Sequence, residues 1–191
     1  MKQRGRVFIL ESPNPLDLLE NRSERYALEQ VCKLVGHDAA TFVLRDRAEF
    51  LQTCNYISSI YGNKNDKRPL FIHISVHGNS DCLGIGRDSI SWDDLTNAVQ
   101  DMYQSLRFYH GPIILILSAC EANKQELTGK LAASVKTGID KWVPPEFVFV
   151  FVEDKISWQE AVVTWTIFYH EATKLDFTDR STVQTLLTRL G

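Results

Sequence analysis

Hydrophobic residues in this chain form short continuous runs that alternate with stretches of helical spacing. The runs cover residues 7–10, 40–44, 70–76, 113–117 and 147–152. Continuous runs rich in β-branched residues indicate strands that are buried on both faces. Strands that alternate with helices are typical of βαβ units and a parallel sheet. We therefore expect an α/β fold, a three-layer α/β/α sandwich whose mostly parallel sheet has the flavodoxin-like strand order 2-1-3-4-5.

Helix-spaced hydrophobic positions and capping signals predict the helices between these runs. Residues 16–35, 48–61 and 121–135 carry helical spacing. Two further helices are expected to begin at Trp92 and Trp158, because Ser91 and Ser157 each precede an acid by three positions. That spacing is the sequence signature of a capping box, which satisfies backbone N–H groups in the first turn.

Length and composition restrict the possible classes of protein. The 191 residues suggest a single domain spanning residues 1–191. A net charge of −3 argues against a nucleic-acid partner, and no hydrophobic run approaches the length that a membrane helix needs. The four cysteines are Cys32, Cys54, Cys82 and Cys120, without a CxxC pair or a zinc-like spacing to histidine. We expect reduced thiols, a cytoplasmic protein, and neither metal nor cofactor.

Candidate catalytic residues follow two of the predicted strands. His77 and Gly78 come directly after the third run, and Ala119 and Cys120 follow the fourth. Ligands of open α/β sheets bind at the carboxyl ends of the strands. In the order 2-1-3-4-5 the third and fourth strands are neighbours, so the imidazole and the thiol are expected at the same edge of the sheet, within side-chain reach.

An imidazole beside a thiol is the arrangement that nucleophilic catalysis by cysteine requires. The thiolate is the nucleophile, and a nearby imidazole can take its proton and later protonate a leaving amine. We predict His77 as the general base and Cys120 as the nucleophile, with the N–H groups of Gly78 and Cys120 as oxyanion donors. The expected helix after Cys120 would lower the pKa of the thiol. His73, on the same face of its strand, is expected to be a buried and hydrogen-bonded histidine.

The order of these motifs resembles the caspase-like superfamily, which includes caspases, metacaspases, gingipains, separase and bacterial CHAT domains. A strand ending in His77-Gly78 precedes one ending in Ala119-Cys120, 43 positions separate the histidine from the cysteine, and a helix that begins with Ser91-Trp92 lies between them. The chain looks especially similar to CHAT and stand-alone bacterial caspase-like proteases over residues 7–169. The resemblance implies a cysteine endopeptidase with a His77–Cys120 dyad. It also implies a protein substrate, such as a gasdermin-like or toxin-like partner in bacterial defence or cell death.

The residues that would select the substrate depart from those of known relatives. Ser118 stands two positions before the nucleophile, where caspases have glutamine and metacaspases an acid. The specificity for the substrate residue before the scissile bond, P1, therefore stays open. Acids gather at the predicted strand ends, namely Glu11, Asp46, Asp81, Glu121, Glu153 and Asp154. They either face the cleft and favour a basic P1 residue or complement helix dipoles. Ser118, Glu11, Glu153 and Asp154 are the candidate substrate-binding residues.

Two other functions compete with the protease. The first is a catalytically inactive caspase-like scaffold, although an inactive module has no need to retain both His77 and Cys120. The second is a nucleotide or small-molecule binder with a flavodoxin-like sheet. The sequence Glu-Ser-Pro-Asn-Pro at residues 11–15 disfavours it, because no glycine-rich phosphate loop follows the first strand.

Overall fold

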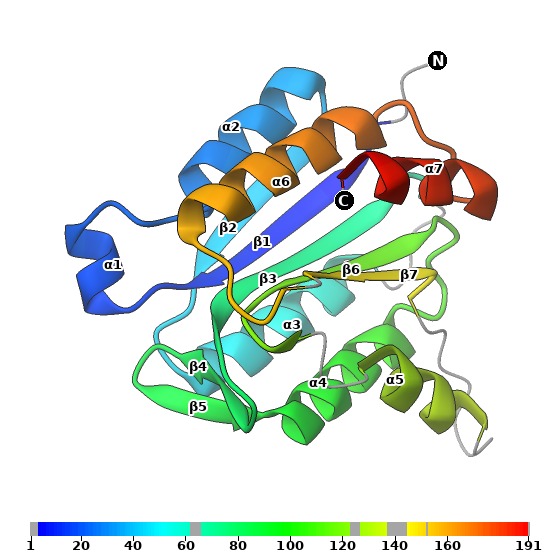
Figure 1. Ribbon diagram of the computed structural model, residues 1–191. Helices are drawn as coiled ribbons and strands as arrows, with labels where there is room; N and C mark the ends of the chain where they lie inside the picture. Colours follow the sequence, from blue (N-terminus) through cyan, green and yellow to red (C-terminus); the bar gives the residue numbers. More distant parts are fainter. Residues whose placement is uncertain (1–3, 62–65, 123–126, 137–144, 152, 191) are drawn as a thin grey trace.

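A parallel sheet lies between two layers of helices in the computed structural model, which describes residues 4–61, 66–122, 127–136, 145–151 and 153–190 (Figure 1). The parallel strands are β1 (Arg6–Ser12), β2 (Asp38–Val43), β3 (Leu70–Gly78), β6 (Ile113–Ser118) and β7 (Phe147–Val150). Their order across the sheet is β2-β1-β3-β6-β7. Counted among the parallel strands alone this is 2-1-3-4-5, so the predicted fold class is confirmed.

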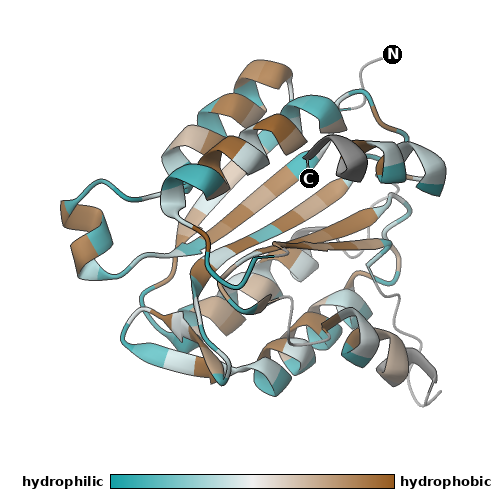
Figure 2. Ribbon diagram, in the orientation of Figure 1, coloured by the Kyte–Doolittle hydropathy of each residue, from teal (hydrophilic) through white to brown (hydrophobic). Residues whose placement is uncertain are grey.

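The helices divide between the two faces of the sheet. One face is covered by α2 (Arg25–Val35), α6 (Trp158–Ala172) and α7 (Arg180–Leu190). The other face is covered by α3 (Arg47–Tyr61), α4 (Trp92–Ser105) and α5 (Leu127–Lys136). Because side chains alternate along a strand, each strand supplies both cores. The apolar strands between the two helical layers stand out in Figure 2.

Alternation along β1 and β3 defines the two cores. Val7, Ile9 and Phe71 pack with residues of α2 and α6, whereas Phe8 and Ile72 pack with residues of α3 and α4. Odd-numbered positions of β3 therefore face α2 and α6, as do even-numbered positions of β6 such as Ile114 and Ile116. The same alternation determines which polar side chains share a face of the sheet.

The helix predicted over residues 16–35 is two helices, and the single-helix prediction is wrong. A short helix α1 (Pro15–Leu19) projects from the edge of the molecule and is followed, after a turn, by α2 (Figure 1). In the turn Asn21 adopts a φ of 54°, which ends helical geometry. The buried Glu11 carboxylate then accepts hydrogen bonds from the backbone N–H groups of Glu24 and Arg25. A side chain from β1 thus caps α2, which local spacing cannot reveal.

The helix predicted to begin directly after Cys120 is also misplaced. Cys120 lies in a turn, and Glu121 adopts a φ of 61° in the left-handed region. The described part of α5 begins only at Leu127. Glu121 is therefore not helical, whereas the described residues 127–136 of the predicted segment are.

The two serine-capped helices begin where they are predicted. The Ser91 hydroxyl accepts from the N–H of Asp94, and the Ser157 hydroxyl accepts from the N–H of Glu160. The reciprocal bond that completes a capping box is present at Ser157, whereas Asp94 instead pairs with Arg47. Among the described residues, no helix is both long enough and apolar enough to cross a lipid bilayer.

An antiparallel hairpin that the sequence analysis did not predict extends the carboxyl end of β3. It consists of β4 (Cys82–Ile85) and β5 (Asp88–Ser91), and β4 pairs with His77 and Gly78. The hairpin turns at Gly86, whose φ is 60°. A Cβ atom at Gly86 would lie 2.0 Å from the carbonyl oxygen of Arg45, so the turn requires glycine.

We expect Gly86→Ala to lower the free energy of unfolding by about 2 kcal/mol or more, because it combines left-handed strain with a backbone clash. Gly84→Ala in the same hairpin is the matched control, since the nearest atoms to its Cβ would lie 3.8 Å away. Urea denaturation of both variants measures the difference. Equal stabilities for the two variants would contradict the described turn.

Candidate active site

The pairing of β3 with β6 brings His77 and Cys120 to one edge and one face of the sheet. Ser75 lies opposite Ser118 in this pairing, and His77 and Cys120 each follow two positions later. Both side chains have the parity that faces α2 and α6. They line the same cavity, which has a volume of about 50 Å³. The expected meeting of imidazole and thiol at one edge is therefore observed.

Gly78 allows the two strand ends to approach closely. A Cβ atom at this position would lie 2.4 Å from the carbonyl oxygen of Cys120 and 3.3 Å from the Cβ atom of Ala119. Any side chain would push the Cys120 segment away from β3. The glycine that follows the histidine is thus a steric condition for the site, independent of any role for its N–H group.

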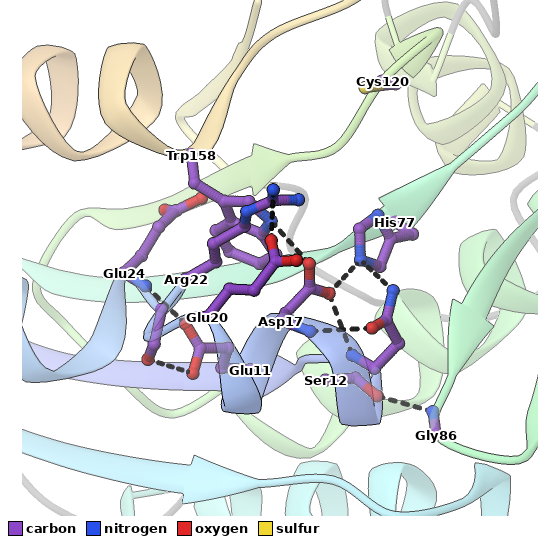
Figure 3. A network of polar contacts seen from close by, with 12 residues as sticks. Glu11, Ser12, Asp17, Glu20, Arg22, Glu24, His77, Gly86, Cys120 and Trp158 are labelled. Carbon is purple, nitrogen blue, oxygen red and sulfur yellow. Dashed lines mark hydrogen bonds and ion pairs between the residues drawn. The ribbon is translucent and has the colours of Figure 1, made fainter.

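The imidazole of His77 is held by two residues from the start of α1 (Figure 3). The Nε2 atom lies 2.5 Å from Oδ2 of Asp17 and 3.2 Å from Nδ2 of Asn14. The His77 side chain is 47% exposed, whereas that of Asp17 is only 3% exposed. An exposed imidazole is therefore anchored on a buried carboxylate.

A capping box fixes the position of both residues that touch His77. The Asn14 Oδ1 atom accepts from the N–H of Asp17, and Oδ2 of Asp17 accepts from the N–H of Asn14. The other oxygen of Asp17 accepts from the indole N–H of Trp158 at 3.2 Å, and the Trp158 ring lies edge-on to the His77 ring. The start of α1 is thereby joined to the start of α6 across the histidine.

Asn14, Asp17 and Trp158 were not predicted to be site residues. The signal was present: an asparagine, a proline at the next position and an acid three positions on predict a helix start. That start directly follows the carboxyl end of the first strand, at the edge where His77 was expected.

The contacts of His77 define its tautomer. A single ring nitrogen can either donate to Asp17 or accept from Asn14, and the shorter contact is with the carboxylate. An N–H at Nε2 leaves the lone pair on Nδ1. In Figure 3 the His77 ring lies between Asp17 and Cys120. The histidine thus contacts a carboxylate at Nε2 and shares its cavity with Cys120.

Cys120 lies in a turn that follows β6 in the sequence. This turn contacts the segment just before α6. The Sγ atom of Cys120 is 4.0 Å from the carbonyl oxygen of Ile156. The next residue, Glu121, is in the left-handed region, and its N–H donates to the carbonyl of Asp154. The N–H of Glu121 is therefore already used. The N–H groups of Gly78 and Cys120 remain the predicted oxyanion donors.

A buried acid, Glu24, lies at the floor of the cavity. Its carboxylate accepts from the Ser118 hydroxyl at 2.7 Å and contacts Nε2 of His73 at 3.2 Å. Ser118 in turn accepts from the indole N–H of Trp165, and Nδ1 of His73 lies 3.0 Å from the Tyr169 hydroxyl. His73 is fully buried and hydrogen-bonded, as expected. Ser118 was predicted to be a site residue and Glu24 was not, because only the fold brings the two side chains together.

The acids predicted to bind substrate occupy different surroundings. The Glu11 side chain is fully buried and bonds Ser23, Arg25 and the start of α2, so its assignment to substrate binding is wrong. Burial raises the pKa of Glu11, although its hydrogen bonds oppose that shift. Asp46 caps α3 by accepting from the N–H of Glu49. Glu153 and Asp154 are exposed and do not line the cavity, so their binding of substrate stays a prediction.

Comparison with known proteins identifies the fold of this chain but does not establish an activity. No protein-family model matches the sequence, and no curated protein matches it significantly. Caspase-1 from Spodoptera frugiperda matches with a TM-score of 0.46 and 19% identity over 62% of this chain and 49% of that one. The structure of drICE matches with a TM-score of 0.55 and 15% identity over 99% of this chain and 81% of that one.

The likeness to drICE supports a caspase-like fold. The chain spans about half the length of the Spodoptera frugiperda caspase-1 chain and most of the drICE chain. The fold of drICE agrees with the mostly parallel sheet described above. At 15% identity the likeness to drICE establishes the fold alone. Activity rests on the side chains of the site.

The four cysteines are expected to differ sharply in reactivity toward N-ethylmaleimide in the folded protein. Cys32 and Cys54 are buried, and burial raises the pKa of each to about 12, which suppresses the reactive thiolate at neutral pH. Cys120 and Cys82 are partly exposed and should react first. Peptide mapping by mass spectrometry reads out each site, and a sample unfolded in guanidinium should react at all four. Equal modification of Cys54 and Cys120 in the folded protein would contradict the described packing.

Proposed function

We propose that this protein is a cysteine endopeptidase in which Cys120 is the nucleophile and His77 the general base. The observation that carries the proposal is the shared cavity of the two side chains at the carboxyl ends of neighbouring parallel strands. The buried Asp17 supports it, because its carboxylate at Nε2 suits a histidine that must gain and lose a proton at Nδ1.

The reaction begins when Nδ1 of His77 takes the proton of the Cys120 thiol. The thiolate attacks the carbonyl carbon of the scissile bond, and the π electron pair of the carbonyl moves to its oxygen. Collapse of this intermediate breaks the C–N bond, and the leaving amine takes the proton from His77. Water, deprotonated by the same imidazole, then hydrolyses the thioester and returns the thiol. Asp17 stabilises the imidazolium that exists between these steps.

The oxyanion of each intermediate requires donors that are fixed before the reaction. We assign this role to the N–H groups of Gly78 and Cys120. The close approach of Gly78 to the Cys120 segment supports the assignment, because it brings the two backbones together beside the nucleophile.

The substrate in this proposal is a protein. Resemblance to CHAT and stand-alone bacterial caspase-like proteases supports a gasdermin-like or toxin-like partner in a defence or cell-death pathway. The exposed His77 supports it as well, because a polypeptide can reach an open catalytic rim.

Labelling by peptidyl chloromethyl ketones tests the two catalytic assignments. We expect one adduct on the wild-type protein, none on Cys120→Ala, and labelling slowed by about 10²- to 10⁴-fold in His77→Ala, because the thiol loses its base. Intact mass spectrometry measures the adduct. Cys82→Ala is the control and should label at the wild-type rate. An adduct that persists in Cys120→Ala and disappears in Cys82→Ala would assign the nucleophile elsewhere.

Asp17→Asn tests the carboxylate behind the histidine. The amide keeps the size of the side chain and an acceptor for Trp158, but it loses the charge that stabilises the imidazolium. We expect kcat on a cleavable peptide to fall by about 10- to 1000-fold with KM unchanged. Asp94→Asn at the matching position of α4 should stay within about twofold. A purely structural role for Asp17 would instead lower the melting temperature and leave kcat of the folded fraction intact.

A further inference from the structure

His77 and Cys120 line a cavity whose mouth is exposed and whose floor is buried. Its walls are mostly apolar, and an acid lies at its floor. His77 at its mouth is 47% exposed, whereas the Glu24 side chain at its floor is 3% exposed. The apolar walls are formed by Val76, Ala119, Ile156, Trp158 and Ala161. A volume of about 50 Å³ suits part of one unbranched side chain and is far below that of a cofactor site.

The carboxylate of Glu24 contacts a hydroxyl and an imidazole. The Ser118 hydroxyl and Nε2 of His73 contact its two oxygens. Burial raises the pKa of Tyr169 well above its ordinary value, so its hydroxyl keeps its proton. That hydroxyl lies 3.0 Å from Nδ1 of His73, whose Nε2 atom faces Glu24.

No lysine or arginine in the described part of the chain forms an ion pair with Glu24. Its neighbour Arg25 pairs with Glu11 instead. Of the two buried carboxylates Glu11 and Glu24, only Glu11 is paired with a guanidinium. A buried charge without a counterion is costly, and a cation brought by a ligand removes that cost.

We propose that Glu24 receives the cationic end of a lysine or arginine side chain at P1, the residue whose carbonyl Cys120 attacks. The inference rests on the proposed function and names its substrate class. The aliphatic stem of a basic side chain packs on the apolar walls while its charged end reaches the floor. Ser118 positions the Glu24 carboxylate through the 2.7 Å hydrogen bond, and Trp165 holds Ser118 in turn. An acidic P1 residue meets like charge at the same point.

Matched peptide substrates that differ only at P1 provide the test. Lysine and norleucine share an unbranched aliphatic stem, but norleucine lacks the charge, and arginine and aspartate complete the series. We expect kcat/KM of the wild-type protein for P1 lysine or arginine to exceed that for norleucine by about 100-fold, with aspartate lower still. Higher activity on arginine than on lysine, or the reverse, tells which cation fits better.

Variants assign the preference to Glu24. Glu24→Gln should reduce kcat/KM for P1 lysine and arginine by about 100-fold and leave norleucine within about threefold. Glu29→Gln, on the same helix and paired with Lys33, is the control and should retain the basic preference. The wild-type comparison of lysine with norleucine requires no variant, so it stands even if Glu24→Gln does not fold.

The results of these experiments distinguish a failure of the role assigned to Glu24 from a failure of the proposed peptidase activity, on which that role rests. Cleavage that depends on Cys120 but shows no preference for lysine or arginine over norleucine would overturn the role of Glu24 and leave the peptidase intact. A basic preference that survives in folded Glu24→Gln would likewise overturn it. Failure to cleave any peptide of the series, together with no labelling of Cys120, would remove the peptidase and with it this inference.

Discussion

The in-register pairing of β3 with β6 is the constraint on which the rest of the site depends. Six residue pairs hold it, from Leu70 opposite Ile113 to Ser75 opposite Ser118. A slip by one residue would turn Cys120 toward the apolar core under α3 and α4 and bring Leu117 to the polar side. The aliphatic residues of both strands therefore fix the register, and the register fixes the imidazole and the thiol on one face.

The second condition is a polar layer at the carboxyl ends of the strands, beneath α2 and α6. Glu11, Glu24, His73 and Ser118 are all buried there, and hydrogen bonds satisfy each of them. Groups of this kind add little to stability compared with well-packed apolar residues. They position one another beside His77 and Cys120: Glu11 anchors the start of α2, and that start carries Glu24 to the cavity floor.

The sequence predicted the sheet because its strand order follows from simple rules. Continuous β-branched runs, alternating with helices, imply buried parallel strands, and the order then places the ends of the third and fourth strands side by side. His77, Cys120 and the buried His73 follow from that order and from side-chain alternation. The hairpin after β3 was missed because its two strands have only four residues each.

The parts that the sequence did not predict depend on contacts between distant segments or on single backbone angles. Glu24 reads as an ordinary acid at a helix start, and only its bond to Ser118, 94 positions away, makes it part of the cavity. Asp17 reads as a capping acid and does cap, yet its carboxylate also contacts His77 and Trp158. The left-handed Glu121 interrupts what spacing alone presents as a helix after Cys120.

A crystal structure of the protein alkylated by a peptidyl chloromethyl ketone tests the central claim most directly. The account predicts a covalent bond at Cys120, with the imidazole of His77 beside the adduct on the face covered by α2 and α6, and the Asp17 carboxylate on Nε2. An adduct on the opposite face of the sheet, or a His77 ring directed away from the modified sulfur, would contradict it.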